Sequence, residues 1–401
     1  MHAKSRRGWL AAVVVALAMA GCGGSQEQPV KPTKKVVETP DQVLAKARSD
    51  RDAGRDAQAL ANYRRALRMQ PDNVDATAEL VDLLIKTSAP GDAVEVSKGY
   101  FDRKPGDPRG YTIYARALVA AGNYPTAYDV LTQLVEIDDK NAAAYDFRAQ
   151  VAAKKGDKQG AVADARKAVE LDAKNVDYRI DLGSALQQAG NLQEAALELR
   201  GALQLDDNSA RAHLLLGVVL RDSYETREAL THHIKAAKLA PKDDRAQFEL
   251  GLTLYEMGDA VGAEAAIQKA VQLKPDDATN WYAYGQILRA QKRWADAVNA
   301  YKKAIDLNPK YDKAYEKLGF VLYNEGKLDE AEVTLTAALR QNPKNPYIYW
   351  NLGQVYEKGQ KYKLAIEAYE KFVAMAPEDG HAPKAKKAIR ILKRKVRRQR
   401  R

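Results

Sequence analysis

The fold is decided by residues 278–311, ATNWYAYGQILRAQKRWADAVNAYKKAIDLNPKY, because altered copies of this stretch follow one another along most of the chain. Apolar residues recur at helical spacing in each half, for example Trp281, Tyr284 and Leu288 in the first, which predicts two amphipathic helices. Asn308-Pro309 ends the second helix, since proline has no amide hydrogen and disfavours a helical predecessor. A helix pair this short cannot bury its apolar faces alone, so neighbouring copies must stack on it.

A period of 34 residues runs from Pro40 to Asp379 without insertion or deletion. Glycine keeps this period at a position where the two helices of a copy must cross closely, because a larger side chain would hold the backbones apart. These glycines are Gly183, Gly217, Gly251, Gly285, Gly319 and Gly353. A second set of glycines stands where a helix must stop and turn. These are Gly54, Gly122, Gly156, Gly190, Gly258 and Gly326. Alanine recurs in all ten copies, from Ala59 to Ala365.

With these residues the array resembles tetratricopeptide repeats, in ten copies over residues 40–379. Copies 108–141 and 142–175 lack the closing proline and have Ala115 and Ala149 in place of the crossing glycine. The resemblance implies an all-α fold, a right-handed α-solenoid superhelix in which the first helix of each pair lines a concave groove. A generic helical bundle is the alternative, but a bundle has no reason to keep one period through ten units.

The N-terminus, residues 1–21, has the features of a lipoprotein signal peptide. Basic residues precede an apolar run from Trp9 to Ala20 that is too short to span a bilayer. The segment LAMAGC, ending at Cys22, resembles the lipobox of bacterial lipoproteins, which implies that the mature chain begins with a lipidated Cys22. A buried or adventitious cysteine is the alternative. Residues 22–39 then form the anchor and a flexible tether rich in Gly, Pro and Lys.

This resemblance also implies a location. In diderm bacteria an aspartate after the lipidated cysteine favours retention in the inner membrane, and Gly23 gives no such signal. We therefore expect an outer-membrane lipoprotein that faces the periplasm, if the cell has an outer membrane. Nucleic acid is not an expected partner for a secreted chain.

Residues 380–401 are predicted to form a basic capping helix and tail. Ala385, Ile389, Leu392 and Val396 have helical spacing and could cover the end of the solenoid. From Lys384 onward there are eleven Lys and Arg and no acidic residue, which equals the net charge of the whole chain, +11. This face is either simply solvated or contacts an anionic lipid or an acidic protein. The candidate contacts are Lys393, Arg394, Lys395, Arg397 and Arg398.

No catalytic, metal-binding or cofactor-binding constellation stands out in the sequence. His232 and His233 are adjacent on a predicted helix and must point in different directions, while His213 fits the edge of the core. No glycine-rich phosphate loop follows a strand, since no strand is predicted. We expect no enzyme activity, no metal and no cofactor.

The groove is predicted to differ between the two halves of the array. By position in the repeat, copies 1–4 present mostly charged residues and later copies present aromatic ones. The predicted partner-binding residues are Phe248, Tyr255, Tyr282, Gln286, Arg289, Phe320, Tyr323, Tyr347 and Trp350. The family's carboxylate clamp for chaperone tails needs a lysine that no copy has at the required position. The aromatic residues could instead pack against the neighbouring copy and only stiffen the superhelix.

These observations lead us to expect a periplasmic, lipid-anchored adaptor that binds a partner segment in its groove. The chain resembles tetratricopeptide lipoproteins that act as pilotins for secretins or that tether peptidoglycan hydrolases. An alternative is a carbohydrate-binding or peptidoglycan-binding module, since aromatic grooves also stack on sugars.

Overall fold

The computed structural model describes residues 38–399, and this part of the chain holds 21 α-helices and no strand. The first twenty helices form ten pairs, one for each 34-residue copy, which confirms the predicted all-α repeat solenoid. The first helices are α1 (Pro40–Asp52), α3 (Val74–Lys86), α5 (Pro108–Ala120), α7 (Ala142–Lys155), α9 (Val176–Ala189), α11 (Ala210–Asp222), α13 (Asp244–Glu256), α15 (Ala278–Ala290), α17 (Asp312–Glu325) and α19 (Pro346–Lys358). The second helices are α2 (Asp56–Met69), α4 (Pro90–Arg103), α6 (Tyr124–Ile137), α8 (Lys158–Leu171), α10 (Leu192–Leu205), α12 (Thr226–Leu239), α14 (Ala260–Leu273), α16 (Trp294–Leu307), α18 (Leu328–Gln341) and α20 (Tyr362–Met375). A final helix, α21, spans Ala382–Gln399.

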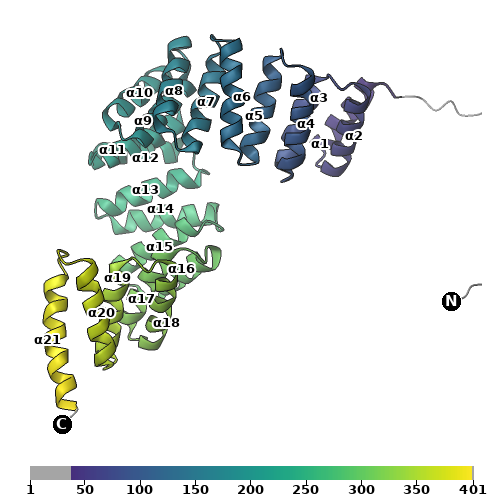
Figure 1. Ribbon diagram of the computed structural model, residues 1–401. Coiled ribbons are helices and arrows are strands. Elements are labelled where there is room, and N and C mark those ends of the chain that lie inside the picture. The colour runs from purple at the N-terminus through teal and green to yellow at the C-terminus, as the bar shows by residue number, and fades with distance from the viewer. Residues whose placement is uncertain (1–37, 400–401) are drawn as a thin grey trace, which may run out of the picture.

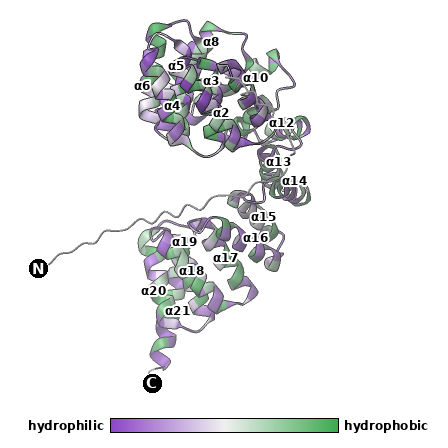
Figure 2. Cartoon of the chain, turned by 90° about the vertical axis from the view of Figure 1, so that its right-hand side faces the viewer, coloured by the Kyte–Doolittle hydropathy of each residue, from purple (hydrophilic) through white to green (hydrophobic). Residues whose placement is uncertain are grey.

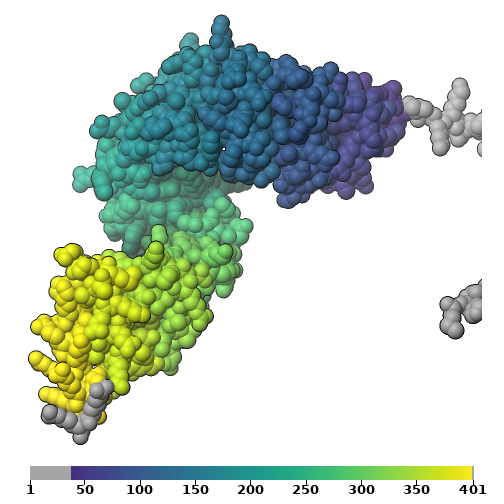
Figure 3. All heavy atoms as spheres, viewed as in Figure 1, coloured from purple at the N-terminus to yellow at the C-terminus, as the bar shows by residue number. Residues whose placement is uncertain are grey.

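The pairs stack into an arch with two arms (Figure 1). Helices α1–α12 build the upper arm, and α17–α21 lie in the lower arm. After a quarter turn, the region around α13–α15 is seen as a narrower connection between them (Figure 2). The space-filling view shows an open hollow between the arms (Figure 3).

First helices form the inner side of this curve. Several successive first helices contact one another directly, for example α7 with α9 and α17 with α19, while the second helices make no comparable contact with each other within residues 38–399. Elements on the concave side of a bent stack lie closer together than those on the convex side. The groove is therefore lined by the first helices, as the family resemblance implies.

The crossing glycines have the role that the sequence predicts. A Cβ atom on Gly319 would lie 2.4 Å from Cγ of Leu335, and one on Gly285 would lie 2.7 Å from the Tyr301 ring. At each of the six glycines, the side chain of the second helix sixteen residues later takes up the room. The ten repeated alanines, Ala59 to Ala365, are also buried, with at most 1% exposed surface.

The turn inside each copy uses a left-handed residue in all ten copies. The six predicted turn glycines have φ between 72° and 90°. The other four copies place Ser88, Tyr224, Lys292 and Gln360 at the same position, with φ between 59° and 64°. The sequence marks only the glycine turns, because a non-glycine residue gives no sign that it will adopt this conformation.

Helix α21 covers the end of the solenoid, as predicted. Ala385 and Leu392 are fully buried against α20, together with Phe372 of that helix. Ile389 packs at the edge of the same cluster. None of the helices that the structure describes is both long and apolar enough to cross a membrane.

Candidate functional site: the concave groove

The nine predicted partner-binding residues lie on four first helices, α13, α15, α17 and α19. Eight of them are partly buried, and Tyr347 is exposed, at 43% of its surface. Their contacts separate them into two groups. The aromatic residues on α13, α15 and α17 pack at the edge of the core clusters of their own repeats, and the two on α19 pack within the last repeat and against the capping segment.

Tyr282 forms the centre of the first group. Its ring centroid lies 5.8 Å from that of Tyr301 on α16 and 4.9 Å from that of Tyr311, which precedes α17. Burial raises the pKa of Tyr282, so its phenol stays protonated at neutral pH. Gln286 follows one turn later on the same helix, and Phe248 and Tyr255 lie at the edge of the neighbouring core cluster.

Arg289 connects α15 to α17. Its guanidinium carbon lies 5.9 Å from the centroid of the Phe320 ring. Its Nε atom is buried and has no hydrogen-bond partner among the described residues, and the same holds for the hydroxyl oxygen of Tyr301. Burial raises the pKa of Tyr301, so this hydroxyl remains a donor. Buried polar groups without partners are uncommon in folded proteins and call for an explanation.

Tyr323 marks the lower end of this group. The Lys358 ammonium lies 4.7 Å from the centroid of its ring and donates a hydrogen bond of 3.2 Å to its carbonyl oxygen. The cation therefore covers one face of the ring, and burial raises the pKa of this phenol as well.

Trp350 is held by the C-terminal packing. Its ring centroid lies 5.5 Å from Tyr369, 5.4 Å from Phe372 and 4.9 Å from His381. Tyr347 donates a hydrogen bond of 2.8 Å to Asp379 in the turn before α21. Both side chains thus link α19 to α20 and to the capping segment.

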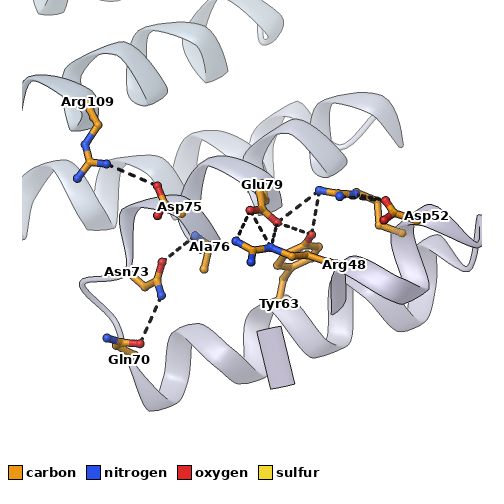
Figure 4. Close-up of polar contacts among 10 residues, drawn as sticks. Arg48, Asp52, Tyr63, Gln70, Asn73, Asp75, Ala76, Glu79 and Arg109 are labelled. Atoms are coloured by element: carbon orange, nitrogen blue, oxygen red, sulfur yellow. Dashed lines mark hydrogen bonds and ion pairs between the residues drawn. The ribbon is translucent and has the colours of Figure 1, made fainter. Parts of the chain in front are cut away.

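Charged residues in the first copies are neutralised within the protein. Arg48 donates two hydrogen bonds from Nε to the carboxylate of Glu79 and one of 2.7 Å from Nη2 (Figure 4). Arg109 lies 3.5 Å from Asp75, and Arg116 lies 3.0 Å from Asp82. The N-terminal half of the groove is charged, as predicted, but many of its charges face each other rather than an open site.

A pair of carboxylates lies further along the groove, on α7 and α9. The side-chain amide of Gln150 donates to Asp146 at 2.9 Å and to Asp181 at 3.1 Å. Burial, and then the nearby Asp181, raise the pKa of Asp146 from 3.8 to about 7. Between pH 3.8 and about pH 7, Asp146 therefore holds a proton in the folded protein that it has already lost in the unfolded chain. The free energy of unfolding consequently falls as the pH rises through this range.

Asp146→Asn is expected to stabilise the protein at pH 8 by on the order of 2 kcal/mol, because a neutral amide replaces a buried carboxylate. The gain should largely vanish near pH 3, which lies below the ordinary pKa of 3.8, because the aspartate is then mostly protonated in the unfolded chain as well. Urea unfolding at the two pH values measures this difference, with Asp139→Asn in an exposed turn as the matched control. A gain that does not change with pH would contradict the assignment.

Sequence reasoning did not include Tyr301 and Tyr311 in the site. Tyr301 belongs to a second helix, α16, and Tyr311 lies in the turn between copies, whereas the groove was predicted from positions on first helices. The available signal was the 34-residue register, which places Tyr301 opposite the crossing glycine Gly285.

The histidines of α11 and α12 make hydrogen bonds within the protein. His213 and His232 share a hydrogen bond of 2.8 Å between their Nδ1 atoms, while His233 points to Thr253, also at 2.8 Å. The two adjacent histidines thus point apart, as predicted, and residues 38–399 contain no cluster of three or more possible metal ligands.

The basic face of α21 is only partly available. Lys393 pairs with Glu370 at 2.8 Å, and Lys395 lies 5.1 Å from the centroid of the Tyr362 ring. Arg394, Arg397 and Arg398 are exposed. Cys22 and the rest of residues 1–37 lie outside the described part of the chain.

Comparison with protein families gives two matches. The family described as tetratricopeptide repeat matches residues 44–108, 115–176, 180–230 and 225–278, together more than half of the chain. The family described as the TPR domain of cytochrome c-type biogenesis protein H matches residues 261–382. Comparison with curated proteins gives no match.

Solved structures include similar solenoids. A chain of the APC/C hetero-tetramer Cut9–Hcn1 aligns with a TM-score of 0.53 and 16% identity, over 88% of this chain and 76% of that chain, which supports the fold. PilF of Pseudomonas aeruginosa aligns with a TM-score of 0.48 and 23% identity, over 52% of this chain and 95% of its own. YrrB, a TPR protein with an unusual peptide-binding site, aligns with a TM-score of 0.41 and 24% identity, over 47% of this chain and 97% of its own.

Proposed function

The chain belongs to the tetratricopeptide repeat family, and from this premise we propose that it is a lipid-anchored periplasmic scaffold that binds a partner protein in its groove. Repeat proteins of this family are in general interaction scaffolds without catalytic activity of their own. The bound segment lies along α13, α15 and α17, and the complex is one of the cell envelope.

The partly buried aromatic cluster on the concave side carries this proposal. Tyr282, Arg289 and Phe320 come from two successive first helices and contact each other or the helix behind them. Aromatic and arginine side chains in such positions are typical anchors of protein interfaces. The charged half of the groove offers less, because its arginines already have partners within the chain.

The same cluster favours a peptide over a sugar. Tyr282 is flanked by the rings of Tyr301 and Tyr311, and Lys358 covers Tyr323. Sugar sites use open aromatic faces together with polar side chains, whereas these faces are already in contact. A carbohydrate-binding or peptidoglycan-binding module is therefore the weaker alternative.

The envelope location rests on the sequence around Cys22. The resemblance of LAMAGC to a lipobox supports an anchor, and the exposed Arg394, Arg397 and Arg398 support a contact of α21 with anionic lipid. The match of residues 261–382 to the TPR domain of a cytochrome c-type biogenesis protein fits a role in assembling another protein.

Photo-crosslinking in intact cells tests the proposal. A photoreactive residue at Tyr323, in the groove, should form an adduct with one defined protein in the membrane fraction. The same residue at Val333, which is 70% exposed on the second helix α18, should not form that adduct. Cys22→Ser should release the protein from the membranes or leave it as precursor.

Two outcomes would contradict the proposal. Equal amounts of adduct from positions 323 and 333, or no adduct from position 323, would show that the groove is not the binding surface. If mature Cys22→Ser protein is found in the membrane pellet at the wild-type level, Cys22 is not the lipid anchor.

A further inference from the structure

Arginine occurs three times at one groove position of the 34-residue register, as Arg51, Arg221 and Arg289. This position is the twelfth of the copy and lies near the end of the first helix. For the first two arginines, a glutamate stands 28 residues further on, on the first helix of the next copy: Glu79 for Arg51 and Glu249 for Arg221.

Both glutamates lie within ion-pair distance of the arginine. Nη1 of Arg51 lies 3.4 Å from Oε2 of Glu79, and the Tyr63 hydroxyl donates to the same oxygen at 2.8 Å (Figure 4). Nη1 of Arg221 donates to Oε2 of Glu249 at 2.6 Å, and both side chains are largely buried. Arg51 also pairs with Asp52 at 2.9 Å, and Glu79 also accepts hydrogen bonds from Arg48. In both copies, however, a glutamate of the next first helix contacts this arginine.

The copy that contains Arg289, residues 278–311, has the arginine and the tyrosine but a cation in place of the carboxylate. Lys317 stands 28 residues after Arg289, at the position of Glu79 and Glu249. Lys317 pairs with its neighbour Glu316, which also accepts a 2.7 Å hydrogen bond from Asn345.

Two buried atoms in the copy 278–311 lack the partners that the first copy, 40–73, provides. The hydroxyl of Tyr301 corresponds in register to that of Tyr63, which donates to Glu79. In residues 38–399 no acidic side chain forms an ion pair with Arg289, and neither its Nε nor the Tyr301 hydroxyl has a hydrogen-bond partner. A carboxylate placed as in the first copy would serve both groups.

We propose that this groove site binds a glutamate side chain of the partner segment, with its carboxylate directed to Arg289 and Tyr301. The inference rests on the proposed function and specifies the chemistry of the bound segment. A glutamate is inferred because both internal examples use one. The site differs from the family's chaperone-tail clamp, whose lysine position is occupied here by Tyr282.

Bead-bound random dodecapeptides, attached through their C-termini so that no terminal carboxylate is free, are the probe for this site. The full chain should select peptides with a glutamate at a fixed position. Replacing that glutamate by glutamine should weaken binding at least about tenfold, as expected for a hydrogen bond to a charged group.

Variants of the chain then locate the contact. Arg289→Gln should remove the difference between the glutamate and glutamine peptides. Lys317→Glu should weaken all selected peptides, because it supplies the carboxylate from the chain itself, whereas Lys317→Gln should not. Arg289→Gln should keep the melting temperature of the wild type, while Arg221→Gln, which breaks a completed pair, should lower it.

The outcomes separate this inference from the proposed function. Selected peptides whose binding does not need glutamate and survives Arg289→Gln would overturn the inference and leave the groove function intact. A second library presents peptides with free C-termini. If peptides are selected only from this library, the site recognises a terminal carboxylate rather than a glutamate side chain, and the inference is overturned as well. Failure to select any peptide from either library would count against both.

Discussion

Trp350→Ala is expected to lower the free energy of unfolding of the last repeat by about 3 kcal/mol. The ring packs against Tyr369, Phe372 and His381, with centroid distances between 4.9 and 5.5 Å. Truncation would leave a cavity between α19, α20 and the segment that leads into α21. Position in the repeat alone placed Trp350 in the groove, where truncation would have cost binding rather than stability.

Hydrogen exchange in residues 346–399 is the appropriate measurement. The stability of a solenoid is roughly a sum over repeats and their interfaces, so a terminal repeat can open without the rest and escape a global melting curve. Tyr347→Ala on the same helix is the matched control, because its ring is 43% exposed and its ring contacts with Phe372 and His381 are longer, at 6.4 and 6.5 Å. If Trp350→Ala leaves the hydrogen-exchange protection of residues 346–399 unchanged but abolishes the crosslink to the partner, Trp350 acts as a binding residue of the groove.

Gly319→Val should destabilise the array by about 3 kcal/mol, at the upper end of the usual cost of overpacking. A Cβ at this position meets the branch carbon of Leu335 at 2.4 Å, and Leu335 is fully buried. Relief of the clash requires either a new χ1 rotamer of Leu335, which the packed core around this buried side chain opposes, or a separation of the two helices. Urea unfolding measures the loss.

Two controls separate the crossing from a general effect of valine. Gly380→Val should be nearly neutral, since a Cβ there meets nothing within 4 Å. In the double variant with Leu335→Ala, the loss of stability should be smaller than the sum of the two single losses, because the smaller side chain makes room for the valine. Equal losses from Gly319→Val and Gly380→Val would contradict a close crossing.

The crossing also bears on the proposed site. Gly319 directly precedes Phe320, whose ring lies beside the Arg289 guanidinium. A shift of α17 away from α18 would therefore change the distance between the two walls of the groove. Variants of the crossing glycines should affect partner binding as well as stability.

The sequence alone determined the repeated unit. Residues close in the chain specify it: a helical period of apolar side chains, an alanine and a glycine at the crossing, and a turn residue fifteen positions into the copy. It also predicted the cap, since Ala385 and Leu392 stand at helical spacing and are buried as expected. These features depend on contacts within one copy, and repetition made each of them visible several times.

The tertiary structure decided which side chains of the groove are free to bind. Trp350 and Arg289 are both on first helices at positions that should face the groove, yet Trp350 is covered by α20 and the capping segment while Arg289 keeps unpartnered polar atoms. Trp350 is covered by Phe372 on the second helix of its own copy, whereas Arg289 faces Lys317 of the next copy at the position where two other copies have a glutamate. Such contacts join residues of different helices or copies, and their geometry depends on how the copies stack, which the pattern within one copy does not specify.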